Sequence, residues 1–438
     1  MTTSRPNIVF ILADDLGIGD VGAYGQTRIQ TPALDRMAAE GMRFTQFYAG
    51  GPVCGPARAC LMTGQSQACG FIKGNPGGDP LRENLRTEDV TVAERLKAGG
   101  YETACIGKWG LGKAGLSGYP LEKGFDYFVG YDTHVAAHDY YPHTLCRNRG
   151  RCRLRRGTYS HDVFTEEALS WIDADRDRPF FLYLAYTIPH TPYNPPDLGP
   201  YEDCDWPSPR REYAAMVTRM DRDIGRVLDL LKAKGLERST LVLFASDNGP
   251  QSNYGNGEND MTRFFDSNGV WRGIKRDVYD GGIRIPFLAW WPGIVAPGTE
   301  SAHVGAFQDL MPTLCELIEE PAPGSTDGIS FLPTLTGHPQ QQLSHDRLYW
   351  EFISMGPEKG GRQSALDVSG NTKAVRYGRH APVALYDLNQ DAGERTNLAG
   401  DRPELAADMT RYLDTVRSPS ALWPLQWHDR GWRPPEEY

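Results

Sequence analysis

The chain has 438 residues, of which 56 are acidic and 46 are basic, so its formal net charge at pH 7 is −10. This balance argues against broad electrostatic attraction to nucleic acid or to an anionic membrane, and any anionic ligand must therefore be bound locally. Eight cysteines are too sparse over this length for a small disulfide scaffold, and none forms the C-x-x-C pair of a zinc ribbon or a thioredoxin-like site.

Strands and helices are predicted to alternate along most of the chain. Continuous apolar runs are typical of buried strands, and a glycine follows each predicted helix. Strands are predicted over residues 8–12, 102–106, 180–186 and 241–245, and helices over residues 31–40, 91–98 and 211–234. This alternation predicts an α/β fold, with a large, mostly parallel sheet flanked by helices on both faces.

The pattern changes after residues 321–333, which are rich in Pro, Gly, Ser and Thr and predict a loop. Shorter strands are predicted beyond it, over residues 347–352, 373–377 and 384–388, with a closing helix over residues 403–416. We therefore expect a large domain over residues 1–335 and a smaller C-terminal subdomain over residues 340–438, built on an antiparallel sheet.

Polar residues follow two of the predicted strands. Asp14 and Asp15 come after the first strand, and Asp247 and Asn248 come after the strand over residues 241–245. In parallel sheets, ligands bind beyond the carboxyl ends of the strands. Three carboxylates and one amide oxygen brought together there would suit Ca²⁺ or Mg²⁺. Taken singly, each pair also suits a helix N-cap or an Asx-turn.

A second candidate site is the segment over residues 51–64, which contains Cys54, Pro56 and Arg58. A thiol at a predicted helix start, with an arginine nearby, is expected to have a lowered pKa. Cys54 is therefore a candidate thiolate nucleophile, and a structural cysteine in a tight turn is the alternative.

This segment resembles the C-x-P-x-R signature of the type I sulfatases, and it continues with Leu61, Thr63 and Gly64 at the family's spacing. Further segments are similar to motifs of that family and occur in the same order: Asp14-Asp15, residues 100–109, residues 189–192, residues 246–249 and residues 273–286. The resemblance extends over nearly the whole chain, as far as residues 385–388. It implies the fold of the alkaline phosphatase-like superfamily.

The resemblance also implies a chemistry. In that family a maturase oxidises the signature cysteine to Cα-formylglycine, whose hydrate attacks sulfur with one hydroxyl and expels sulfate with the other. Cys54 would be this residue, Arg58 would steady the hydrate, and Lys108 would contact both hydrate and sulfate. His190 and Lys275 would hold the sulfate and protonate the leaving oxygen. The implied ligands of Ca²⁺, or alternatively Mg²⁺, are Asp14, Asp15, Cys54, Asp247 and Asn248.

Two positions depart from the family's pattern. Ala57 replaces the usual serine of the signature, which we expect to matter little. Gly110 stands where many sulfatases carry a histidine that contacts the formylglycine hydroxyl and is proposed as the base that completes the reaction. His134 and His138 are candidates for this vacant role, and for contact with sulfate or sugar. Some carbohydrate sulfatases with the same G-K-W-G-L-G variant carry a similar A-H-x-Y-Y-P segment.

The spacing of the two histidines leaves other interpretations open. Residues i and i+4 share one face of a helix, where His134 and His138 could bind zinc, and both could also be purely structural. Six arginines between residues 147 and 156 form the one strongly basic patch of the chain. They could line the approach of a polyanionic substrate such as a sulfated glycan, or form a solvated loop.

The sequence therefore predicts a metal-dependent sulfuric ester hydrolase, acting on a sulfated carbohydrate and matured by a formylglycine-generating enzyme. A phosphonate or phosphate monoester hydrolase of the same superfamily is one alternative, and a catalytically silent protein that binds sulfated glycans is another. No nucleic-acid or membrane partner is expected, and the oligomeric state is left open. Because no export signal is visible, we expect a cytoplasmic protein if the chain is complete, and a periplasmic or secreted one if a signal has been removed.

Overall fold

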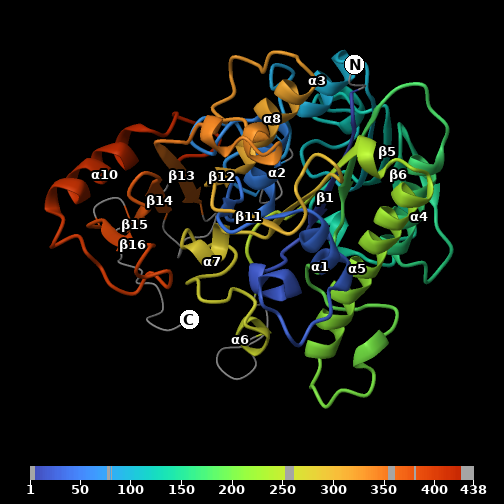
Figure 1. Ribbon diagram of the computed structural model, residues 1–438, viewed down its shortest axis with the longest axis horizontal. Coiled ribbons are helices and arrows are strands. Elements are labelled where there is room, and N and C mark those ends of the chain that lie inside the picture. Colours follow the sequence, from blue (N-terminus) through green and yellow to red (C-terminus); the bar gives the residue numbers. More distant parts are fainter. Residues whose placement is uncertain are drawn as a thin grey trace.

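The computed structural model describes residues 5–75, 79, 81–251, 261–353, 361–378 and 381–425. Its centre is a ten-stranded sheet in the order β11-β2-β10-β9-β1-β8-β4-β5-β6-β7. Figure 1 labels β1, β5 and β6 of this sheet, with α4 (Ser160–Asp173) and α5 (Arg210–Ala233) beside them. The five central strands are parallel: β9 (Thr240–Ser246), β1 (Asn7–Ala13), β8 (Phe180–Ala185), β4 (Glu102–Lys108) and β5 (Tyr127–Tyr131). The predicted α/β fold with a mostly parallel sheet is confirmed.

The outer strands join this parallel centre through antiparallel pairs, β10 with β9 and β6 with β5. On one side lie β10 (Phe287–Trp290), β2 (Met42–Phe44) and β11 (Thr299–Ser301), and on the other lie β6 (Thr144–Arg147) and β7 (Gly150–Arg153). A separate two-stranded sheet pairs β3 (Phe47–Tyr48) with β12 (Gly305–Ala306). These short elements were not predicted, because runs of two to four residues carry too little periodicity to identify a strand.

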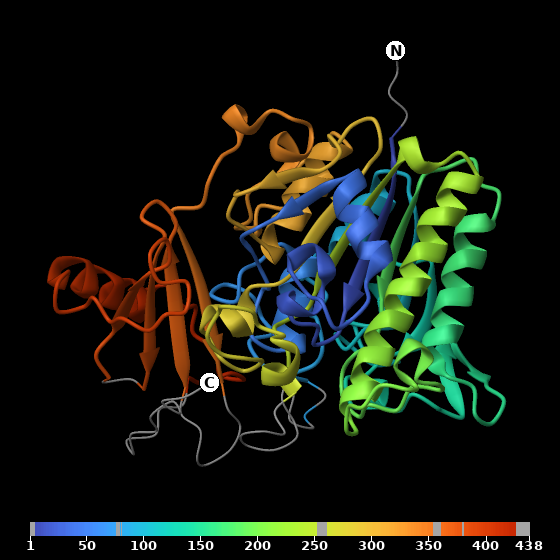
Figure 2. The same ribbon diagram turned by 60° about the horizontal axis from the view of Figure 1, so that its bottom comes forward.

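Helices cover both faces of the large sheet, as the continuous apolar pattern of β1 requires. Ile8, Phe10 and Leu12 pack on one face, with side chains of α2 (Cys54–Thr63), α3 (Val92–Ala98) and α8 (Leu310–Leu317). Val9 and Ile11 pack on the other face, with α1 (Pro32–Glu40), α4 (Ser160–Asp173) and α5 (Arg210–Ala233). Figure 2 shows α4 and α5 as the green helices along one side of the sheet.

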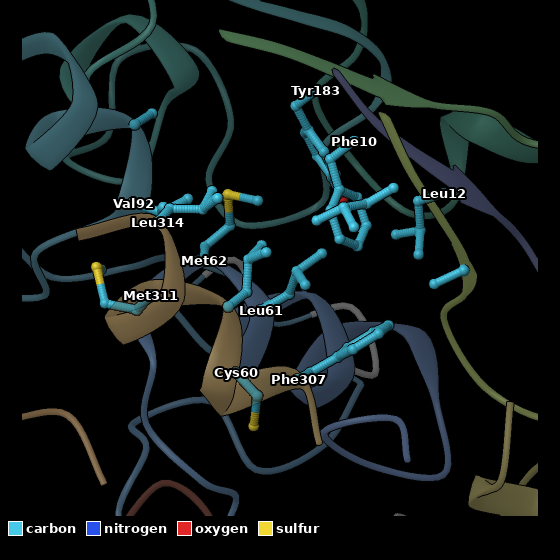
Figure 3. Close-up of a cluster of buried hydrophobic side chains, with 14 of the residues drawn as sticks. Phe10, Leu12, Cys60, Leu61, Met62, Val92, Tyr183, Phe307, Met311 and Leu314 are labelled. Carbon is cyan, nitrogen blue, oxygen red and sulfur yellow. The ribbon is translucent and has the colours of Figure 1, made fainter. Parts of the chain in front are cut away.

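The first of these two faces is drawn in Figure 3, where Phe10 and Leu12 of β1 lie over Leu61 of α2. All ten residues of α2 are buried, including its polar ones. A helix surrounded by protein on all sides is held rigidly. Its first residue, Cys54, is therefore fixed beneath the carboxyl edge of the sheet.

The C-terminal part forms a four-stranded antiparallel sheet in the order β13-β14-β15-β16. Its strands are β13 (Arg347–Phe352), β14 (Arg362–Asp367), β15 (Thr372–Tyr377) and β16 (Ala384–Asp387). One face packs against α10 (Pro403–Thr415), and the other packs against Tyr48, Val278 and Ile283 of the large part. Figure 2 shows α10 in red, on the side of this sheet that faces away from the large part. The described part of the chain also contains the short α-helices α6 (Met261–Phe265), α7 (Asp280–Ile283) and α9 (Leu332–Leu335). The division into domains at residues 335–340 stays a prediction.

Candidate active site

Asp14 and Asp15 lie beside Asp247 and Asn248, beyond the carboxyl ends of β1 and β9. The two strands pair in parallel up to Ala13 and Ser246, so the residues that follow them meet at one edge of the sheet. The main-chain N–H of Asp15 donates to Asp247 Oδ1 at 3.2 Å. Asp15 has a φ of +66°, a left-handed conformation that is uncommon for residues other than glycine and clusters at functional sites.

The side chains at this edge fit a divalent cation. One ligand atom from each of Asp14, Asp15, Cys54 and Asp247 lies within 4.8 Å of the others. Asn248 Nδ2 donates to Asp15 Oδ1 at 2.8 Å, whereas its Oδ1 atom is buried and has no hydrogen-bond partner within the described part of the chain. A buried acceptor without a partner is costly, and a hard cation among the carboxylates would give it one.

The expected low pKa of Cys54 is wrong. Cys54 is the first residue of α2 and is buried, with its Sγ atom 3.4 Å from Asp14 Oδ1. Burial raises the pKa of this thiol, and the negative charge of Asp247 raises it further, against the opposing charges of Lys108 and Lys275. Burial, helped by the neighbouring carboxylates, therefore disfavours an ordinary thiolate nucleophile here.

Arg58 is fully buried one helical turn beyond Cys54, so both side chains lie on the same side of α2. Its Nε and Nη2 atoms donate to Asp247 Oδ2 at 3.1 and 2.8 Å, and Nη1 donates to the main-chain oxygen of Lys108 at 2.9 Å. Arg58 thus ties α2 to the ends of β9 and β4. Burial, with the charge of Asp14, still raises the pKa of Asp247 to about 6.

Two lysines bring their ammonium groups to the other carboxylates. Lys108, the last residue of β4, places Nζ 2.6 Å from Asp14 Oδ2, and Lys275 places Nζ 2.7 Å from Asp15 Oδ2. Although burial alone would raise it, the charges of Lys108, Arg58 and Lys275 hold the pKa of Asp14 well below its usual value. The three carboxylates and the three cations, counting Arg58, cancel in formal charge. A divalent cation would therefore make this pocket positive and suited to an anionic ester.

His190 and His138 form a stacked pair at the same edge. Their ring centroids are 3.9 Å apart with planes inclined by 11°. His190 Nδ1 donates to the main-chain oxygen of Thr191 at 2.6 Å, which leaves Nε2 facing Asp15 Oδ2 at 3.4 Å. Burial lowers the pKa of His190 to about 4 and that of His138 to about 3, so both rings are neutral at pH 7.

His134 has different neighbours from His138. The 3-10 helix at Ala136–His138 is too short to place both rings on one helical face, so the geometry assumed for the zinc interpretation is wrong. His134 Nδ1 lies 2.6 Å from Glu83 Oε1, and its ring lies against Gly110. Glu83 was not predicted, and neither was Gln251, whose Oε1 atom accepts from Lys275 Nζ at 3.0 Å. Each is a single polar residue in a loop, without a pattern that sequence could reveal.

The arginine-rich segment forms the β6–β7 hairpin and the residues after it. Arg147 pairs with Glu167 and Arg149 with Glu122. Arg153 is exposed opposite Thr144, and β6 runs antiparallel to β5, so Arg153 lies at the edge of the sheet where the parallel strands end. This is also the edge that carries Cys54 and the carboxylates. None of the described helices has both the length and the apolarity that a bilayer crossing needs.

Comparison with known protein families gives two matches along the chain. The sulfatase family model matches residues 6–319, and a model of the C-terminal part of N-sulphoglucosamine sulphohydrolase matches residues 269–418. N-acetylgalactosamine-6-sulfatase of Mus musculus is 34% identical over 94% of this chain and 85% of its own length. Arylsulfatase A of Homo sapiens is 34% identical over 90% of this chain and 83% of its own length.

The fold is likewise similar to that of solved structures. The crystal structure of Ps i-CgsB in complex with k-i-k-neocarrahexaose superposes with a TM-score of 0.81 at 26% identity, over 94% of this chain and 92% of that chain. The family model, which covers most of the chain, and the two relatives at 34% identity all point to the same family. The chain belongs to the sulfatase family and is an enzyme of the sulfuric ester hydrolase class.

Proposed function

We propose that this protein hydrolyses sulfate monoesters of a sulfated carbohydrate, using a formylglycine formed from Cys54 and a divalent cation. The observation that carries the proposal is the set of three carboxylates and three cationic side chains gathered around the first residue of α2. A carbohydrate substrate is supported by the names of the relatives, which include an N-acetylgalactosamine-6-sulfatase and a structure with a bound neocarrahexaose.

The cation would be held by Asp14, Asp15, Asp247, Asn248 and residue 54. Ca²⁺ is the expected ion and Mg²⁺ the alternative, since both prefer oxygen ligands. When bound, the cation would polarise the sulfate oxygens, and formylglycine in its hydrated form would supply the attacking hydroxyl. Conversion of Cys54 would require a formylglycine-generating maturase as a partner.

The remaining side chains would bind the sulfate and move a proton. Lys108 and Lys275 would neutralise charge on the sulfate oxygens, because their ammonium groups already lie at the carboxylate cluster. Arg58 would hold residue 54 and Asp247 in register. His190 Nε2 is the atom available to carry a proton, and negative charge arriving with a sulfate favours its protonation. His190 or Lys275 would then protonate the leaving oxygen.

His138 and His134 would complete the substrate side of the pocket. The half-buried ring of His138 stacks on His190, and its Nε2 atom has no hydrogen-bond partner among the described residues. A sugar hydroxyl or a sulfate oxygen bound beside His190 would meet this ring. His134 lies deeper, against Gly110.

The test combines mass spectrometry of residue 54 with a measurement of sulfate release. Protein co-produced with a maturase is digested, the peptide containing residue 54 is weighed, and sulfate release is measured on a panel of sulfated sugars. We expect formylglycine at position 54 and catalytic release. An unmodified thiol in fully active protein would refute the formylglycine route. Cys54→Ser serves as the matched variant, since a serine ester has no second hydroxyl and should stop after at most one turnover.

The same preparation separates the two alternatives. Comparing kcat/KM for an aryl sulfate and the matching aryl phosphate tests for a phosphonate or phosphate monoester hydrolase, which would prefer the second ester. A silent glycan-binding protein would bind sulfated sugars after full conversion of Cys54 but release no sulfate.

A further inference from the structure

Gly110 and His134 occupy one space. Gly110 lies two residues beyond β4 and has a φ of +72°. A Cβ atom added there would lie 2.3 Å from His134 Cε1, 2.4 Å from Nδ1 and 2.9 Å from Nε2. These distances are far inside van der Waals contact, so the imidazole fills the volume that a side chain at position 110 would need. The ring of His134 can lie here because Gly110 has no side chain.

The topology explains how two residues so far apart in sequence meet. β4 and β5 pair in parallel, with Lys108 opposite Tyr131 at their carboxyl ends. Gly110 and His134 follow these paired residues by two and three positions. The ring therefore lies at the edge of the sheet that carries Lys108. The charges of Lys108 and Arg58 also act on His134, which puts the ring within electrostatic range of the cations around Cys54.

Glu83 fixes the ring and its proton. Its Oε1 atom accepts from the main-chain N–H of His134 at 2.7 Å and from ring Nδ1 at 2.6 Å. A carboxylate only accepts, so Nδ1 carries the hydrogen and Nε2 of the neutral ring carries a lone pair. Burial lowers the pKa of His134 in spite of this hydrogen bond, which keeps the ring neutral.

The lone pair on His134 Nε2 accepts no hydrogen bond from the described residues. His134 is only 5% exposed, and its Nε2 atom is buried without a hydrogen-bond partner among the described residues. Buried polar atoms in native proteins are almost always satisfied, and exceptions are typical of functional sites. A neutral imidazole, oriented by a carboxylate and holding a free acceptor atom, is the arrangement that accepts a proton or a hydrogen bond from a hydroxyl group.

We propose that Glu83 and His134 form a dyad in which His134 Nε2 accepts from a hydroxyl group bound beside Lys108, and that Gly110 is the position that admits this ring. The proposal rests on the proposed function for the origin of the hydroxyl, which belongs either to converted residue 54 or to the sugar that bears the sulfate. Glu83 is a positioning residue, because it acts through His134.

The first test does not depend on activity. Protein with unconverted Cys54 is labelled with ¹⁵N-histidine, and His134→Ala identifies the resonances of the ring. We expect a neutral ring protonated at Nδ1, a form that Glu83→Gln retains and Glu83→Ala loses, since only the amide oxygen of glutamine can still accept from Nδ1. A wild-type ring protonated at Nε2 would overturn the dyad.

The second test uses converted enzyme with an aryl sulfate and a sulfated sugar. We expect kcat/KM of His134→Gln to fall by about 10²-fold or more, because glutamine fills the space and donates to Glu83 but has no basic nitrogen. Glu83→Ala should lose about 10–100-fold. Loss on both substrates assigns the hydroxyl to residue 54, and loss on the sugar alone assigns it to the sugar. Activity of His134→Gln within twofold of wild type on both substrates would refute the proposal.

A rescue separates this role from a structural one. Gly110→His collides with His134 in the wild type, but in His134→Ala the new ring has room, and we expect it to restore kcat/KM at least tenfold. His143→Ala, an exposed histidine of the same segment, is the control and should behave as wild type. If converted wild-type enzyme releases no sulfate from any ester, the proposed function fails, and the NMR test alone decides on the dyad.

Discussion

Replacing Arg58 by methionine tests the buried ion cluster directly. The guanidinium is fully buried and donates two hydrogen bonds to Asp247 Oδ2 and one to the main chain of Lys108. Methionine keeps an unbranched chain of similar length but leaves Asp247 buried without its cationic partner. Removing one member of a buried ion pair costs about 3–5 kcal/mol. This is a large fraction of the roughly 5–15 kcal/mol by which native proteins are stable.

The assay is denaturant unfolding of chelator-treated protein at pH 7.5 and pH 5. The pKa of Asp247, already about 6, rises further without Arg58. A carboxyl group whose folded pKa exceeds its unfolded value contributes stability at low pH that is lost as the pH rises through the folded pKa. The deficit of Arg58→Met should therefore be smaller at pH 5 than at pH 7.5. Arg153→Met, at an exposed arginine of β7, is the control. Equal unfolding midpoints for the two variants at pH 7.5 would refute the reasoning.

Three further changes probe the cation, the basic hairpin and a distant ion pair. Ca²⁺ added to chelator-treated protein at 100 times its Kd should stabilise it by about 2.7 kcal/mol, and Asn248→Ala at the same Ca²⁺ concentration should recover less; equal recovery would contradict the ligand assignment. Reversing Arg153, Arg155 and Arg156 to glutamate should raise KM for a sulfated oligosaccharide about tenfold at low salt and leave an aryl sulfate unaffected, and a change for both esters would argue against a glycan path. Burial alone would lower the pKa of His345, but its pairing with Asp309 raises it. The stability lost in His345→Gln should therefore be largest below the unfolded pKa of histidine, about 6.5, and should shrink as the pH rises through the folded pKa; unfolding midpoints across this pH range measure it.

The sequence predicts the fold well where elements are long. The helix predicted over residues 211–234 is observed as α5 at Arg210–Ala233, because an amphipathic repeat of this length has no other regular interpretation. The strand predicted over residues 8–12 is observed as β1, and its alternating side chains enter the two hydrophobic clusters. By contrast, β2 and β10 pair with each other through residues far apart along the chain, and local sequence does not encode such pairing.

The site divides in the same way. Asp14 and Asp247 could be placed together from sequence because each follows a strand, and parallel strands end at one edge. The pKa of the Cys54 thiol could not be predicted, since it depends first on how deeply the thiol is buried and then on how closely Asp247 and Asp14 approach it in the folded protein. The contact between Glu83 and His134 could not be predicted either, because it forms only when the two loops meet in the folded protein. Sequence therefore identifies the groups that end regular elements, and misses those that act through side-chain contacts between loops.

The small C-terminal sheet bonds to two segments of the candidate active site. Trp350 of β13 donates its Nε1–H to the main-chain oxygen of Ala49, in the segment that leads to Cys54, at 2.8 Å. Arg362 of β14 donates to the main-chain oxygen of Arg276 at 2.8 Å and also pairs with Asp277, so it holds the loop that carries Lys275. The two segments also bond to each other directly, since the main-chain N–H of Arg276 donates to the main-chain oxygen of Pro52 at 2.8 Å. The second sheet therefore helps to position both the segment that leads to Cys54 and the loop that carries Lys275.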